Sequence, residues 1–161
     1  MNAAIEIDYL VAADFSAAGY VPNAQAINRW VECALEFAAY KNPAQVSVCV
    51  VDKQEITALN NQYRKKNYAT NVLSFPYEPM PGVDVPLLGD IAVCAEVINE
   101  EAREQRKTAE QHWAHMIVHG VLHLLGYDHI DDKDAQQMEA MEIRILEQLG
   151  FTDPYGEINN L

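Results

Sequence analysis

Apolar and polar residues follow two different periods along this chain. The segment 5–11 alternates between the two kinds, which is typical of a strand with one buried face, and the valine-rich segment 45–51 is typical of a second strand. Between them, apolar residues recur every three to four positions from 23 to 40, as in an amphipathic helix. The same criteria predict further strands over 71–77 and 88–94, and further helices over 52–63, 95–107, 108–126 and 131–149.

Residues with strong positional preferences mark several helix ends. Asp52 is followed by Glu55, and Thr108 by Gln111, as in the capping box that opens a helix. A glycine follows each of the last two predicted helices, which is a common way for a helix to end. These elements predict an α+β fold: a single domain over residues 1–161, with a mixed sheet of about four strands covered by about five helices. The second and third strands flank a helix, so they are expected to be joined as a parallel crossover.

The composition fits a globular cytoplasmic protein. Half of the 161 residues are hydrophobic, which is enough for a packed core, and this length suits one domain. The N-terminal segment has early acidic residues and no basic start before an apolar run, so neither a signal peptide nor a membrane span is expected. The three cysteines are odd in number and far apart, which favours buried thiols in a reducing compartment over a thiolate metal site.

The charge of the chain limits what it can bind. A formal net charge of −13 argues against a general nucleic-acid coat, because contacts to phosphate need Lys and Arg. Six of the eleven basic residues nevertheless fall in two short clusters, at 64–66 and 103–107. From charge alone, two ordinary solvated faces are favoured over a local binding patch.

All five histidines of the chain fall between positions 112 and 129. His119 and His123 lie one turn apart on the predicted helix, close enough for both imidazoles to bind one metal ion. Gly126 lets the backbone leave the helix, so that the chain can turn and bring His129 to the same ion. Packing alone does not explain three histidines at this spacing, and they predict a metal site formed by His119, His123 and His129.

The spacing of these residues matches the metzincin zinc motif H-E-x-x-H-x-x-G-x-x-H at every position except one. Three neutral imidazoles on Zn²⁺ leave a fourth position open for water, which is typical of a catalytic site. Where the motif has its general-base Glu, however, the chain has Gly120. The pattern therefore predicts one zinc ion, but it leaves peptide hydrolysis without its proton acceptor.

Three neighbouring residues have less certain roles on the sequence. His115 shares the face of the predicted ligands one turn earlier, so it either supports a ligand from behind or contacts the substrate. His112 is expected to be exposed. Asp128 is either an acceptor for an imidazole N–H or a residue that stabilises the turn.

The segment His119–His129, HGVLHLLGYDH, resembles the signature H-G-x-L-H-L-x-G-Y-D-H of the YbeY family of endoribonucleases. The segments LNNQYRKKNYATNVLSFPYE and LLGDIAV resemble two other blocks of that family, with Ala69 in place of a frequent proline. The lead-in HWAHMIVHG and the final acidic helix also fit, so that the resemblance runs from about Val46 to Tyr155.

This resemblance implies a metal-dependent, single-strand-specific endoribonuclease that acts in 16S rRNA 3′-end maturation and ribosome quality control. The three histidines above match the family's metal ligands, and Arg64 matches its functionally important arginine. A guanidinium offers paired N–H donors to charge that develops on phosphate oxygens, so Arg64 is the predicted catalytic residue. The implied partners are single-stranded rRNA and small-subunit components, including a ribosomal protein and an assembly GTPase, with no membrane.

Two other functions stay open on the sequence. A zinc metalloprotease-like hydrolase is supported by the spacing of the ligands and opposed by Gly120. A non-catalytic ribosome-assembly factor, in which the metal only stabilises the fold, would keep the same ligands without needing Arg64. The sequence does not decide between water and a ribose 2′-OH as the attacking group.

Overall fold

The structure is a computed structural model, and it describes residues 4–78, 81–82 and 85–155. The predicted α+β class is confirmed, with a four-stranded mixed sheet and, within the described ranges, five α-helices and one short 3-10 helix. The elements in chain order are β1 (Ile5–Val11), η1 (Ser16–Ala18), α1 (Ala24–Phe37), β2 (Ala44–Val51), α2 (Lys53–Arg64), β3 (Val72–Pro76), β4 (Leu87–Cys94), α3 (Ala95–Glu104), α4 (Ala109–Leu124) and α5 (Asp132–Gln148).

The strand order in the sheet is β1-β2-β4-β3. β1 is parallel to β2, and β2 is parallel to β4, whereas β3 is antiparallel to β4. The expectation that the second and third strands form a parallel crossover is therefore wrong. The described residues between β3 and β4, at 77–78, 81–82 and 85–86, contain no helix, and so short a connection favours antiparallel pairing because a parallel pair needs a longer crossover.

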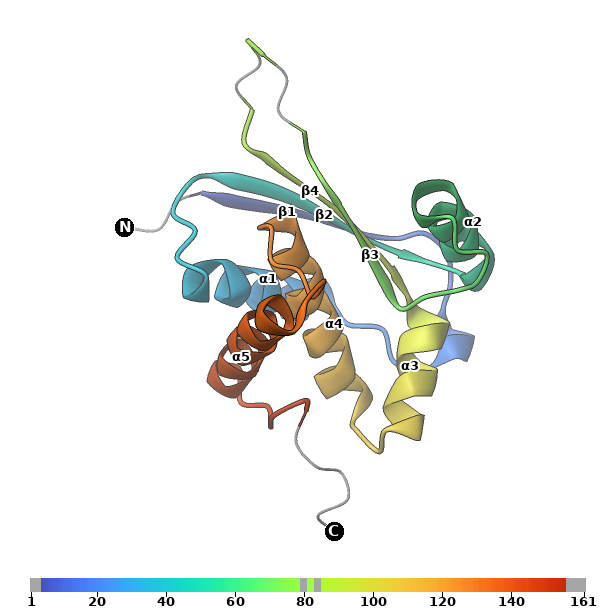
Figure 1. Ribbon diagram of the computed structural model, residues 1–161. Coiled ribbons are helices and arrows are strands. Elements are labelled where there is room, and N and C mark those ends of the chain that lie inside the picture. The colour runs from blue at the N-terminus through green and yellow to red at the C-terminus, as the bar shows by residue number, and fades with distance from the viewer. Residues whose placement is uncertain (1–3, 79–80, 83–84, 156–161) are drawn as a thin grey trace.

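Each face of the sheet has its own hydrophobic core. Val46, Val48 and Val50 of β2 face the larger core, which α1, α3, α4 and α5 complete. Cys49 and Val51 of the same strand face the smaller core, which α2 covers. This alternation follows from the pleat of a strand, in which successive side chains point to opposite faces. Figure 1 shows α2 on the other side of the strands from α1, α4 and α5.

The helix α4 lies at the centre of the larger core, in contact with α1, α3, α5, β3 and β4 (Figure 1). Trp113, Ile117 and Leu122 on it are completely buried. A helix that is apolar on most of its surface has neighbours on most sides, and α4 shows this. Its first turn is capped as predicted, since the Thr108 hydroxyl accepts a hydrogen bond from the backbone N–H of Gln111 at 3.1 Å.

The prediction of buried cysteines holds in full for one of the three. Cys94 is buried, Cys33 and Cys49 are half-buried, and all three are free. Burial raises the pKa of each thiol, so the thiols stay protonated near neutral pH.

Gly89 on β4 lies where this strand, β3 and the end of α4 come closest together. Its φ of +151° is one that residues with a side chain rarely adopt. A Cβ atom at this position would lie 2.5 Å from the backbone oxygen of Phe75 and 2.6 Å from Cδ2 of Leu124. Only glycine therefore lets the end of α4 sit this close to the two strands.

Replacing Gly89 by Ala should destabilise the protein by about 3 kcal/mol or more, because backbone strain and overpacking act together. The matched control is Gly150→Ala, which also has a positive φ but has nothing within 4 Å of the added Cβ. This control should lose only about 1 kcal/mol. The free energy of unfolding in urea measures both, and equal losses would contradict the close packing at Gly89.

Candidate metal centre

The three predicted ligands come together at the C-terminal end of α4. Nε2 of His119 lies 3.0 Å from Nε2 of His123. The helix ends just before Gly126, whose φ of +97° turns the chain back and places His129 beside the other two. One ring nitrogen from each of the three histidines lies within 4.8 Å of the other two. The arrangement is that of three imidazoles around one point.

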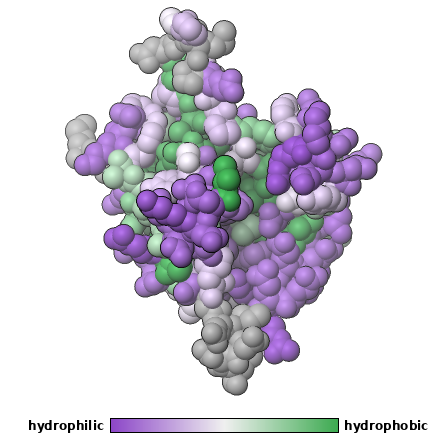
Figure 2. All heavy atoms as spheres, in the orientation of Figure 1, coloured by the Kyte–Doolittle hydropathy of each residue, from purple (hydrophilic) through white to green (hydrophobic). Residues whose placement is uncertain are grey.

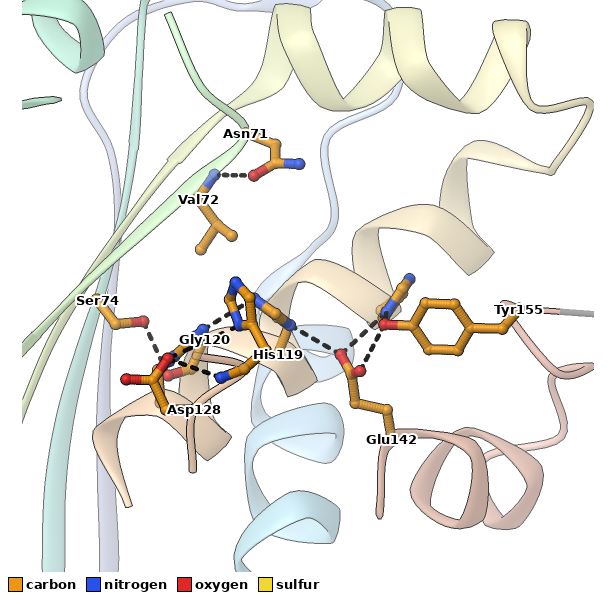
Figure 3. A network of polar contacts seen from close by, with 11 residues as sticks. Asn71, Val72, Ser74, His119, Gly120, Asp128, Glu142 and Tyr155 are labelled. Carbon is orange, nitrogen blue, oxygen red and sulfur yellow. Dashed lines mark hydrogen bonds and ion pairs between the residues drawn. The ribbon is translucent and has the colours of Figure 1, made fainter. Parts of the chain in front are cut away.

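A buried carboxylate holds His119 from behind. Nδ1 of His119 lies 2.9 Å from Oε2 of Glu142 on α5 (Figure 3). The side chain of Glu142 is 0% exposed. Because a carboxylate only accepts hydrogen bonds, the proton of a neutral His119 ring is on Nδ1. The lone pair on Nε2 is then available to a metal ion, and it lies on the side of the ring that faces Nε2 of His123.

Glu142 is ionised although it is buried. Burial raises the pKa of its carboxyl, but hydrogen bonds from His115 and His119 outweigh burial and bring the pKa to about 2. Nε2 of His115 lies 3.0 Å from Oε2 of Glu142, and the hydroxyl of Tyr155 donates to Oε1 at 2.6 Å. His115 therefore shares with His119 the carboxylate behind this predicted ligand, an arrangement consistent with one of the two roles expected for it.

The donor set fits a metal ion that prefers nitrogen ligands. Burial, together with the charges of His119 and His129, lowers the pKa of His123 to about 4, so the ring is neutral near pH 7, as a ligand must be. Two nitrogen atoms 3.0 Å apart are within the span of two ligands of one zinc ion, whose bonds to histidine are about 2.0–2.1 Å long. His129 is more exposed, with 57% of its side chain accessible.

The expectation that His112 is exposed is wrong. The residue is 2% exposed, and its Nε2 lies 2.9 Å from Oε1 of Glu101 on α3. The reason is that α4 is covered on this side by α3, a contact that the sequence of α4 alone does not reveal. For Asp128 the structure decides between the two readings: its Oδ1 accepts a hydrogen bond from the backbone N–H of His129 at 2.7 Å, which stabilises the turn.

Gly120 packs against the sheet beside the first ligand. A Cβ atom there would lie 3.1 Å and 3.2 Å from two methyl carbons of Ile91 and 3.3 Å from Oγ of Ser74. The hydroxyl of Ser74 donates to the carbonyl oxygen of Gly120 at 2.9 Å (Figure 3). The position that carries a glutamate in metzincins is therefore tightly packed in this protein, and a side chain there would have to displace atoms of Ile91 and Ser74.

Arg64 lies one residue beyond the predicted helix 52–63. It is the last residue of α2, and Lys65 ends the helix in the left-handed conformation. The Arg64 side chain is exposed and forms no hydrogen bond or ion pair within the ranges 4–78, 81–82 and 85–155. The preceding Tyr63 packs edge-on against Phe75 of β3, with ring centroids 4.9 Å apart, so the end of α2 lies against the edge strand.

Glu142 is the site residue that the sequence analysis missed. The sequence does contain a signal, because Glu142 is an acidic residue on the apolar face of α5, between the buried Met138 and Ile145. A carboxylate on such a face needs hydrogen-bond donors from another part of the fold. Only the packing of α5 against α4 identifies those donors as His115 and His119.

A pocket of about 310 Å³ opens beside two of the three histidines. Its lining includes His119, His129, Glu142 and Tyr155. The centre is thus accessible from outside, unlike a closed structural site. The fold and the centre together define a class: an α+β protein with an open three-histidine site of the kind found in metal-dependent hydrolases.

Comparison with known proteins gives the family. The profile of the endoribonuclease YbeY family matches residues 19–150. A protein named endoribonuclease YbeY from Cellvibrio japonicus (strain Ueda107) is 51% identical over 142 residues, which cover 88% of this chain and 80% of that protein. One of the same name from Coxiella burnetii (strain Dugway 5J108-111) is 51% identical over 138 residues, covering 85% of this chain and 91% of that protein.

The solution structure of a Thermotoga maritima protein has a similar fold, with a TM-score of 0.58 and 28% sequence identity, and the match covers 94% of this chain and 99% of that one. The chain belongs to the endoribonuclease YbeY family. The resemblance in the sequence is thereby confirmed, and so is the prediction of a nuclease of the hydrolase class. No helix in the described part of the chain is long and apolar enough to cross a membrane.

Replacing His119 by Ala should remove bound zinc, because the variant loses the ligand whose ring Glu142 orients. The matched control is His112→Ala on the same helix, which likewise removes an imidazole bonded to a carboxylate, here a buried one, but leaves the three predicted ligands. Elemental analysis of the purified, zinc-loaded proteins should find about one ion in the wild type and the control. Stoichiometric zinc in His119→Ala would show that the ligand assignment is wrong.

Proposed function

We propose that this chain is a zinc-dependent, single-strand-specific endoribonuclease that acts in 16S rRNA 3′-end maturation and ribosome quality control. The observation that carries the proposal is the meeting of His119, His123 and His129 at one point, in a member of a family of endoribonucleases. Those three residues would hold the ion. Zinc is proposed because all three donors are imidazole nitrogens, and because three protein ligands are typical of catalytic zinc.

When bound, zinc supplies a Lewis acid that polarises a phosphoryl oxygen and lowers the pKa of water. The chain's own residues do the remaining work. Glu142 keeps a proton on Nδ1 of His119 and so keeps this ring in one orientation. Arg64 would bind a non-bridging phosphate oxygen through paired N–H donors, which stabilises the charge that develops there during cleavage.

The basic end of α2 supports an RNA substrate. Arg64, Lys65 and Lys66 are consecutive and exposed, so they are available to phosphate groups. Figure 2 shows a hydrophilic mass over α2 and another over the start of α5, with a recessed, partly apolar strip between them. A strand of RNA lying in this strip would contact the basic end of α2 on one side and approach the histidines on the other.

Exposed aromatic residues beside the basic segment support the preference for single strands. Tyr63 is 59% exposed and Tyr68 is 56% exposed, and they stand on either side of the segment Arg64–Asn67. Unpaired bases stack on such rings whatever their sequence, whereas the bases of a duplex are already stacked on one another. The rings would therefore favour unpaired RNA without selecting a particular base.

The two alternatives are less well supported. A metalloprotease of the metzincin type needs a carboxylate where this chain has Gly120, and atoms of Ile91 and Ser74 would have to move to admit a side chain there. A non-catalytic assembly factor needs neither an open pocket beside the histidines nor an exposed arginine facing solvent. The pocket lined by His119 and His129 therefore favours catalysis.

The zinc-loaded protein should cleave single-stranded RNA, leave duplex RNA nearly intact and leave casein uncut. Arg64→Ala should reduce the rate of RNA cleavage by about 100-fold or more, because a donor to the developing charge is lost. Folding and zinc content should be unchanged in this variant, since Arg64 is exposed and lies outside the predicted ligand set. The rates are measured on a labelled oligonucleotide and analysed by gel electrophoresis.

Arg103→Ala is the matched control, because Arg103 is an exposed arginine of the other basic cluster, at the end of α3. It should cleave RNA at close to the wild-type rate. Wild-type cleavage by Arg64→Ala would remove Arg64 from the mechanism. Casein cleavage with RNA left intact would favour the protease, and zinc binding without any cleavage would favour the assembly factor.

We propose that the substrate is the RNA of small-ribosomal-subunit precursors in the cytoplasm. The net charge of −13 affects how the protein binds this RNA. An acidic protein is repelled by naked RNA, so docking through a ribosomal protein or an assembly GTPase would supply the missing attraction. At about 0.15 M salt, the protein should sediment with purified small subunits but not with naked 16S rRNA. Equal binding to both would contradict docking through a protein.

A further inference from the structure

We propose that Tyr155 is a positioning residue of the metal centre, which acts on His119 through the carboxylate of Glu142. The inference rests on the proposed metal function, but it concerns the affinity of the site for zinc rather than the cleavage of RNA. It adds to the centre a residue from the C-terminal segment, which lies outside the stretch of histidines.

The hydrogen bonds of Glu142 indicate that Tyr155 is a positioning residue. Its Oε2 accepts from His115 and His119, and among the described residues the only donor to its Oε1 is the hydroxyl of Tyr155, at 2.6 Å. A charged oxygen without a donor in a buried site is costly. Without the hydroxyl, the carboxylate would have to rotate or shift to find another donor, and it would then no longer face Nδ1 of His119.

The phenol is a dependable donor in this place. Burial, with the negative charge of Glu142 next, raises the pKa of Tyr155 well above its usual range, so the hydroxyl keeps its proton. The ring also packs edge-on against His115, with centroids 5.3 Å apart. Figure 3 shows Tyr155 reaching across to Glu142 from the side opposite His119. The carboxylate is therefore held between the two.

Two contacts fix the segment that carries Tyr155 to the beginning of α4. Nζ of Lys107 donates to the carbonyl oxygen of Pro154 at 2.7 Å, and Nε2 of Gln111 donates to the hydroxyl of Thr152 at 2.9 Å. Gln111 of α4 and Lys107 just before this helix thus anchor the segment of Tyr155 near the beginning of the helix that carries His119.

Tyr155 also lines the pocket beside the histidines and is 45% exposed. Its ring forms part of the cover that keeps Glu142 away from water. Tyr155→Phe removes only the hydroxyl and keeps this cover, so the variant tests the hydrogen bond rather than the packing. Tyr9→Phe is the matched control, because the Tyr9 hydroxyl donates one half-buried hydrogen bond, to the carbonyl oxygen of Pro22 at 2.9 Å, away from the centre.

The test measures the dissociation constant of Zn²⁺ by competition with a chelator of known affinity. Tyr155→Phe should weaken zinc binding about tenfold, at the lower end of what losing such supporting hydrogen bonds costs. Tyr9→Phe should bind zinc like the wild type. In a Glu142→Gln background, Tyr155→Phe should have little further effect, because its route to His119 is already altered. Fully additive losses would show that Tyr155 does not act through Glu142.

A second readout follows the ring of His119 directly. In the metal-free wild type, the ¹⁵N shifts of His119 should report a single tautomer with its proton on Nδ1, and Tyr155→Phe should give a mixture. An unchanged tautomer and unchanged zinc affinity in Tyr155→Phe would overturn the inference. If the wild type itself binds no zinc, both the proposed metal function and the inference are wrong. If the wild type binds zinc and Tyr155→Phe binds it equally well, only the inference is wrong.

Discussion

The close approach of α4 to the sheet is the constraint on which the centre depends. A Cβ atom at position 120 would lie 3.1 Å from a methyl carbon of Ile91, which is tighter than ordinary packing, and the hydroxyl of Ser74 bonds the helix backbone at the same point. At the end of the helix, the absence of a side chain at Gly89 lets Leu124 pack directly against the strands. Because α4 is packed on several sides, the positions of its histidines are set by the core.

The second requirement is electrostatic. A buried carboxylate is stable only where donors surround it, and Glu142 has three of them, from His115, His119 and Tyr155. In return its charge fixes where His119 carries its proton, and this leaves one nitrogen free for a metal. The three hydrogen bonds to Glu142 join α4, α5 and the C-terminal segment. They therefore contribute both to the stability of the fold and to the orientation of the His119 ring.

Much of the fold and part of the centre could be predicted from the sequence. Strand and helix positions follow from apolar periods and caps, which depend on neighbours only a few residues away. The direction of β3 was predicted wrongly, because pairing depends on which strand the chain meets next in space. The burial of His112 was missed for a similar reason, since α3 covers it. Glu142 shows itself in the sequence only as an acidic residue on an apolar face.

The sequence by itself determined the chemistry: three imidazoles at a fixed spacing, a glycine that ends their helix, a missing glutamate and a basic segment before β3. These are local features, and helical geometry converts spacing into proximity without help from the rest of the chain. Tertiary structure decided which buried groups support the ligands and why position 120 must be small. Contacts between α4, α5 and the sheet join residues far apart in the sequence, and they depend on packing and buried charge rather than on any local period.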